Sequence, residues 1–138
     1  MIAGPPPASV LDASAALAFV REEQGAARVE RAIRTGALIS TVNWAEVLSA
    51  LSEDGETLEQ AVGRTRARIE RVGLLTVIAF DEAHAQQTAR LRLPTRSLGL
   101  SLADRACLAL GRIHRLPVLT TDRAWRSLHI SVKIEVIR

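Results

Sequence analysis

Short apolar runs and longer amphipathic stretches alternate along the chain. Short runs rich in Val, Ile and Leu, bounded by Gly, Pro or acidic residues, predict buried β-strands. We expect such strands at residues 8–11, 37–40, 74–80, 117–121 and 132–137. The last of these alternates apolar and polar residues, which is typical of an edge strand.

Between these runs, apolar residues recur at three- and four-residue steps, which predicts helices with one buried face. We expect helices at residues 12–20, about 23–35, 41 or 43 through 51, about 57–71, 81–91, 101 onward and 123–128. Thr41 or Asn43 is the expected N-cap of the third helix, and Asp81 that of the fifth. Residues 94–99 are expected to form a loop. The prolines at 5–7 predict a stiff, extended lead-in over residues 1–7.

This order of elements predicts an α/β fold. Short strands that alternate with helices favour a mainly parallel sheet covered by helices on both faces. The 138 residues are enough for one domain, which we expect to span 1–138. A hydrophobic content of 48% with 24% charged residues is typical of an ordered globule and not of a disordered chain.

Charge and cysteine content narrow the function only slightly. The net charge is +3, the pI is about 10.3, and every basic residue except Lys133 is Arg. Arg suits phosphate, but a solvated surface explains a small excess equally well. The single Cys107 cannot form an internal disulfide and is expected in the core. No signal peptide or membrane span is recognisable, so the expected location is the cytoplasm.

Four acidic residues share one kind of position. Asp12, Glu46, Asp104 and Asp122 each lie at the predicted start of a helix, and three of them closely follow a predicted strand. Taken singly, each is explained by helix capping or by the helix dipole. Taken together they suggest a shared site, because parallel topology places the carboxyl ends of all strands, and so these acids, at one edge of the sheet.

Several carboxylates in one place would repel each other and raise their pKa values unless a cation offset their charge. Oxygen ligands without His or Cys favour Mg²⁺ or Mn²⁺ over zinc. The three histidines, His84, His114 and His129, form no ligand motif and are expected at the surface or as caps. A metal held by carboxylates can polarise a water for attack on a phosphodiester. Nucleic-acid hydrolysis fits this chemistry.

These residues also carry a resemblance to a known family. The chain resembles the PIN-domain ribonucleases, in particular the VapC-type toxins of bacterial toxin-antitoxin systems. The resemblance rests on four segments in order: Val10–Ala15 (VLDASA), Asn43–Val47 (NWAEV), Ser101–Asp104 (SLAD) and Leu119–Trp125 (LTTDRAW). Each segment alone is a weak signal, but their order and spacing within this length are specific.

The resemblance implies a three-layer α/β/α fold with a five-stranded sheet in the order 3-2-1-4-5. It implies that Asp12, Glu46, Asp104 and Asp122 form an acidic metal site, with Thr120 as a hydroxyl that helps to hold water or substrate. It further implies Mg²⁺- or Mn²⁺-dependent cleavage of RNA, a homodimer, and inhibition by a cognate antitoxin. The antitoxin groove would lie on the helices between Thr41 and Arg71, with apolar positions such as Trp44 and Leu48.

Other interpretations remain open from the sequence. The main alternative is a catalytically silent PIN-like interaction module whose acids only cap helices. A phosphatase or receiver domain fits less well, because no glycine-rich phosphate loop follows the first strand. Trp44 and Trp125 are expected in the core, although aromatic rings can stack on bases. Arg64, Arg68 and Arg71 form either a solvated helix face or a contact for RNA or an acidic partner.

Overall fold

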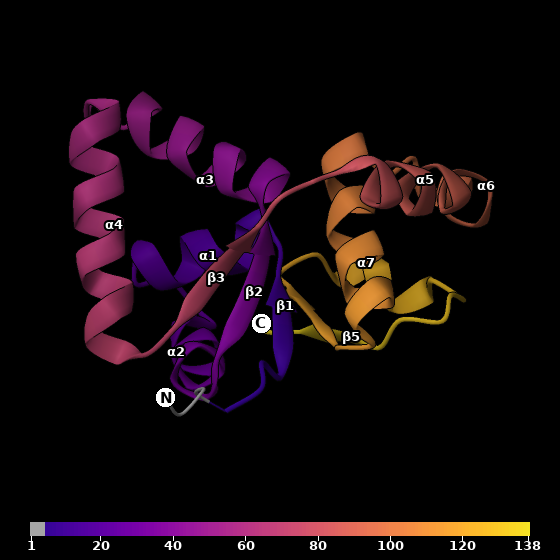
Figure 1. The fold of residues 1–138 in the computed structure, drawn as a ribbon, viewed down its shortest axis with the longest axis horizontal. Coiled ribbons are helices and arrows are strands. Elements are labelled where there is room, and N and C mark those ends of the chain that lie inside the picture. The colour runs from indigo at the N-terminus through magenta and orange to yellow at the C-terminus, as the bar shows by residue number, and fades with distance from the viewer. Residues whose placement is uncertain (1–4) are drawn as a thin grey trace.

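The computed structural model describes residues 5–138, so the first four residues of the predicted lead-in lie outside the described part (Figure 1). The strands are β1 (Ser9–Leu11), β2 (Ala37–Ser40), β3 (Leu75–Ile78), β4 (Val118–Thr120) and β5 (Ile134–Val136). The α-helices are α1 (Ala13–Val20), α2 (Ala26–Thr35), α3 (Thr41–Glu53), α4 (Leu58–Val72), α5 (Glu82–Arg90), α6 (Arg92–Thr95) and α7 (Leu102–His114). Two 3₁₀ segments complete the list, η1 (Arg96–Leu98) and η2 (Arg123–Ser127).

The strands form one parallel sheet in the order β3-β2-β1-β4-β5. This confirms both the predicted fold class and the strand order that the resemblance implies. Strands β1 and β4 are neighbours at the centre, with Leu11 paired to Leu119. The residues that directly follow these two strands therefore meet at the same edge of the sheet.

Both faces of the sheet are covered, because successive strand residues point to opposite sides. Leu11, Ile39 and Leu119 pack against a core formed with α1 to α4. Their neighbours Val10, Leu38 and Val118 pack on the other side with α7 and Trp125. Figure 1 shows the same division, with α1 to α4 on one side of the sheet and α5 to α7 on the other.

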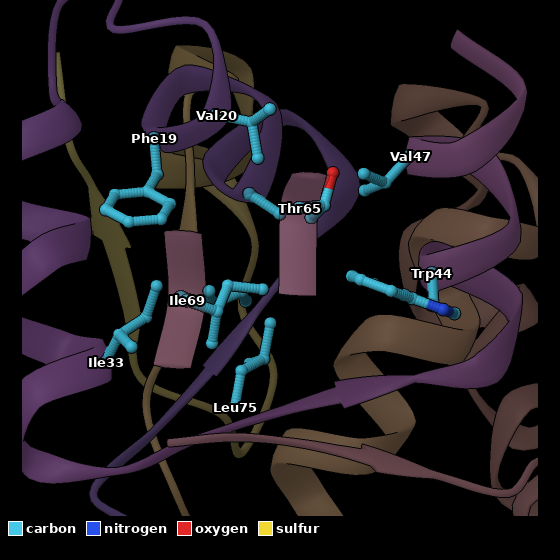
Figure 2. Close-up of a pocket in the computed structure, with 10 residues that line it drawn as sticks. Phe19, Val20, Ile33, Trp44, Val47, Thr65, Ile69 and Leu75 are labelled. Carbon is cyan, nitrogen blue, oxygen red and sulfur yellow. The ribbon is translucent and has the colours of Figure 1, made fainter. Parts of the chain in front are cut away.

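The first of these cores contains a small apolar gap between α1, α3, α4 and the sheet (Figure 2). The gap has a volume of about 10 Å³, which is about the space of one water. Trp44, Val47 and Phe19 line it, and the buried Thr65 hydroxyl lies among them with no hydrogen-bond partner in residues 5–138. This gap is part of the core and too small to bind a substrate.

Local side-chain caps explain where several helices begin. Thr57 and Gln60 form a capping box at α4. At α5 the Asp81 carboxylate accepts from the backbone N–H of His84, which confirms the predicted cap. The predicted cap of α3 was wrong. Ser40, the last residue of β2, has extended backbone angles and accepts from the N–H of Val42, so α3 already begins at Thr41.

Three predicted boundaries differ from the structure. Helix α2 begins at Ala26, because Gly25 before it has a left-handed φ of 98° that interrupts the helix. Residues 94–99 are not a loop: Pro94 lies in the single turn of α6, where its missing N–H costs no hydrogen bond, and η1 follows. The segment after Asp122 is a 3₁₀ helix that ends at Ser127.

The sequence pattern also predicted which tryptophan, cysteine and histidine residues are buried. Trp125 is 1% exposed, Trp44 8% and Cys107 0%, which confirms all three as core residues. His84 is only 6% exposed, so the expectation of a surface or capping role for it was wrong; it packs edge-on against Phe80. Among residues 5–138, no helix has the length and apolar character needed to cross a membrane.

Candidate active site

Asp12 lies where β1 ends and α1 begins, and its carboxylate is held by three donors. The Thr120 hydroxyl donates to Oδ2 over 2.6 Å. The Ser14 hydroxyl and the Ala15 backbone N–H donate to Oδ1 over 2.7 and 2.8 Å. With a side chain that is 6% exposed, Asp12 is both buried and fixed in orientation. It caps α1 as the sequence indicates, but it also faces the end of β4.

Thr120 is the last residue of β4 and connects Asp12 to Asp122. Its hydroxyl donates to Asp12 and accepts from the Asp122 backbone N–H over 3.1 Å. Ser14 contributes a second link, because its hydroxyl accepts from the Thr121 N–H over 3.0 Å. The two hydroxyls lie 3.5 Å apart. The turn after β4 is therefore tied to the start of α1.

Ser14 belongs to the first motif, but the sequence alone assigned it no function. The sequence does distinguish it, because it is the one hydroxyl residue in an alanine-rich helix start and lies two residues after an N-cap aspartate. A serine in the first turn can turn back and donate its hydroxyl to the carboxylate of the N-cap residue. Only the pairing of β1 with β4 brings it to Thr120 and Thr121.

The electrostatic environment of Asp12 is unusual for a carboxylate. Burial raises the pKa of Asp12 from its ordinary 3.8 to about 6, despite the hydrogen bonds from Thr120, Ser14 and Ala15, which lower it. The negative charge of Asp104 adds to the rise. Perturbed acids are common at functional sites, although a buried cap can show the same shift.

Asp104 on α7 lies near Asp12, and Glu46 on α3 lies near Asp104. Burial raises the pKa of the Cys107 thiol on α7, and the charges of Asp12, Asp104 and Glu46 raise it further. Partial desolvation raises the pKa of Glu46, and Asp104 adds to this. Three of the four predicted acids therefore lie around the first turns of α7.

The sequence predicted Glu46 in the first turn of its helix, but this prediction was wrong. Because Ser40 caps α3, Glu46 is its sixth residue and lies in the second turn. Its link to α7 runs through Asn43, whose side-chain amide donates to the Ala103 carbonyl over 3.1 Å and lies 3.5 Å from Glu46 Oε1. Asn43 is 1% exposed and its side-chain oxygen has no partner within the described residues.

The other two aspartates are engaged as helix caps. Asp104 and Ser101 form a capping box, in which the Asp104 carboxylate accepts from the Ser101 N–H over 3.1 Å. Asp122 is exposed, and its carboxylate accepts from the Ala124 N–H at the start of η2 over 3.0 Å. Its backbone lies beside Thr120, but its carboxylate is turned to this cap.

The donor set is composed of oxygen atoms, which matches Mg²⁺ or Mn²⁺ in kind. The geometry is less complete. In the part of the chain that the structure describes, no three acidic, histidine or cysteine side chains gather closely enough to hold an ion. To bind one shared ion, Asp104 and Asp122 would have to exchange their capping hydrogen bonds for metal contacts. The Asp12 carboxylate is oriented by its own hydrogen bonds at the end of β1.

Comparison with known families and structures identifies the fold. Residues 9–130 match the PIN domain model. No curated protein sequence matches the chain significantly. Among solved structures, the chain is similar to DNA-bound VapBC from Salmonella typhimurium, with a TM-score of 0.73 and 17% identity over 94% of this chain and 98% of that one.

Two other structures are similar over almost the whole chain. VapBC2 from Rickettsia felis, bound to promoter DNA, gives a TM-score of 0.71 at 14% identity, covering 92% of this chain and 96% of that one. VapC20 from Mycobacterium tuberculosis, a toxin that cleaves the sarcin-ricin loop, gives 0.65 at 14% identity, covering 91% and 99%. At these identities the similarity concerns the fold. Because the family model spans most of the chain, this protein belongs to the PIN domain family.

Proposed function

We propose that the protein is a Mg²⁺- or Mn²⁺-dependent endoribonuclease that acts as the toxin of a toxin-antitoxin pair. The observation that carries the proposal is the buried Asp12 carboxylate, which is held by Thr120 and Ser14 and lies near the charge of Asp104. The charge of Asp104 also acts on Glu46. Membership of the PIN family and the similarity to VapC structures support a nuclease.

Each site residue then has a proposed role. Asp12, Glu46, Asp104 and Asp122 would hold the metal, which supplies a polarised water and offsets charge on the phosphate oxygens. The Thr120 and Ser14 hydroxyls fix the direction of the Asp12 lone pairs, so this carboxylate needs no reorganisation when it binds a cation. With a pKa of about 6, Asp12 is mostly ionised at neutral pH even without the cation.

The proposed partner is a cognate antitoxin. The similar VapBC structures are toxin-antitoxin assemblies, and this supports a partner of that kind here. A shallow cavity of about 500 Å³ on α3 and α4, lined by Ala45, Leu48, Ser49, Ser52 and Leu58, is the proposed docking place. Leu48 fits the role expected for it, but Trp44 is buried and does not line this cavity. A homodimer remains part of the proposal.

The direct test is RNA cleavage by the purified protein with Mg²⁺ or Mn²⁺ and with EDTA. We expect cleavage with metal, loss with EDTA, and a loss of at least about 100-fold in Asp104→Asn, as is usual when a group acting in the transition state is removed. Asp81→Asn is the matched control, because Asp81 also caps a helix after a strand but lies outside the site. A folded Asp104→Asn protein that cleaves at the wild-type rate would contradict the mechanism.

The alternative is a catalytically silent PIN-like interaction module. One observation favours it: Asp12, Asp104 and Asp122 each accept a hydrogen bond from a backbone N–H at the start of a helix. If capping is their whole role, the Asn variants at all three positions behave like Asp81→Asn. Each then loses a little stability, and no shared activity is lost.

A further inference from the structure

A cavity of about 170 Å³ opens on the segment that joins α6 to α7. It is lined by Arg92, Thr95, Arg96, Gly99 and Leu100. Both arginines are exposed, and within residues 5–138 neither guanidinium has a hydrogen-bond or ion-pair partner. Two like charges four residues apart on a helical segment repel each other. The cavity is therefore a place of uncompensated positive charge.

The arginines of α4 differ from this pair. Arg64 is bound to Glu56 over 2.6 Å, and Arg68 is bound to Glu22 over 3.0 Å while its guanidinium stacks on Phe19. Their charge is thus already offset within the chain. In contrast, residues 83–103 contain three arginines and no carboxylate. Two further arginines of α4 have no carboxylate partner within the described residues, but Arg66 lies over the Trp44 ring and Arg71 donates to the Ala67 carbonyl. The two arginines of α6–η1 make no such contact in the described part of the chain.

This cavity lies close to the candidate active site. Leu100 lines it, and Asp104 follows four residues later, so their Cα atoms are at most about 14 Å apart. Arg105 fixes the arrangement, because its guanidinium donates to the Thr88 carbonyl over 3.1 Å and so ties α5 to the first turns of α7. Figure 1 shows α5 and α6 next to the start of α7.

We propose that Arg92 and Arg96 form an anion site for a backbone phosphate of single-stranded RNA, a few nucleotides from the phosphate that is cleaved. This inference rests on the proposed ribonuclease function. A guanidinium fork binds phosphate oxygens through two parallel hydrogen bonds, and a bound phosphate removes the repulsion between the two arginines. Contacts of this kind position a strand without reading its sequence.

The test is the affinity of the full-length protein for a fluorescent single-stranded oligoribonucleotide of mixed sequence, measured in EDTA over a series of salt concentrations. For the double variant Arg92→Gln/Arg96→Gln we expect about tenfold weaker binding. The slope of log affinity against log salt should also fall by about 0.7, the value for one lost phosphate contact on a single strand. Arg112→Gln/Arg115→Gln, at the other end of α7, removes the same charge and should change neither quantity.

Several outcomes would overturn the inference: no RNA binding by the wild-type protein, equal weakening in both double variants, no weakening in either, or a changed oligomeric state in Arg92→Gln/Arg96→Gln alone. The last would assign the pair to a protein interface. The test is separable from the proposed function. Binding that depends on the pair, without cleavage in Mn²⁺, would contradict the nuclease proposal only. Cleavage with an unchanged KM in the double variant would contradict the arginine site only.

Discussion

Asp12 links the stability of the protein to pH. Its pKa is about 6 in the folded chain and 3.8 in its ordinary state, so the folded state binds the proton more tightly than the unfolded state does. The free energy of unfolding is therefore highest below pH 3.8 as far as this group is concerned, falls as pH rises towards 6, and is level above that. The full change is about 3 kcal/mol for a shift of about two pKa units.

The prediction compares wild type with Asp12→Asn in urea denaturation between pH 4 and pH 7, without metal. The Asn side chain does not titrate, so the stability of the wild type relative to Asp12→Asn should fall by about 2 kcal/mol between pH 4 and pH 7, which is most of the full change. Carboxylates that lie apart from Asp12 titrate alike in both proteins and cancel in the difference. A difference that is constant with pH, or that rises, would contradict the assigned burial of Asp12.

The residue-level predictions succeeded where local chemistry decides and failed where tertiary contacts decide. Asp12 and Asp104 were recognised from their places at helix starts, and both caps are present. The roles of Ser14 and Asn43 were missed, because each depends on a partner distant in the sequence. His84 was misjudged because the sequence does not show that α5 packs on α7; His84 also contacts Phe80, four residues before it.

Among the elements, α3 and α7 carry the second half of the candidate site and are joined by Asn43. Its amide donates to the Ala103 carbonyl, one residue before Asp104, and approaches Glu46. We expect Asn43→Ala to lower the free energy of unfolding by about 1 kcal/mol, because the hydrogen bond between the helices is lost. Urea denaturation measures this loss.

Asn43→Asp is the informative companion variant. It fills the same space but places a further carboxylate beside Glu46 and Ala103 in a buried position. At pH 7 it should be less stable than Asn43→Ala, and the gap should close towards pH 4, where the new acid is protonated. Equal stability of the two variants at pH 7 would show that Asn43 does not lie in an acidic, buried environment.

The boundaries of elements were predictable to the extent that their signals are local. The run of Ala37–Ser40 and the box of Thr57 with Gln60 lie within a few residues, and β2 and α4 lie where expected. The start of α3 was misplaced because Ser40 serves both as strand end and as helix cap. This displaced Glu46 from the first turn to the second, although its face of the helix still meets α7.

For the whole molecule, the pattern of apolar positions was sufficient for the α/β class but not for the order of the strands. The alternation of short strands with helices indicates a parallel sheet with both faces covered by helices. It does not show which strands pair, because Thr120 and Asp12 meet across 108 residues of sequence. The order 3-2-1-4-5 came from the resemblance, and the structure confirms it. The meeting of Asp12 with Thr120, the last residue of β4, follows from that order.

The central claim is that four acids form one metal site, namely Asp12, Glu46, Asp104 and Asp122. A thermal titration with Mn²⁺ tests this claim most directly. A ligand at about 100 times its Kd stabilises the folded state by about 2.7 kcal/mol, which raises Tm by several degrees. We predict this rise in the wild type and in Asp81→Asn, and its loss in both Asp12→Asn and Asp104→Asn. A wild-type Tm that Mn²⁺ leaves unchanged, or a rise that survives in both site variants, would contradict the account.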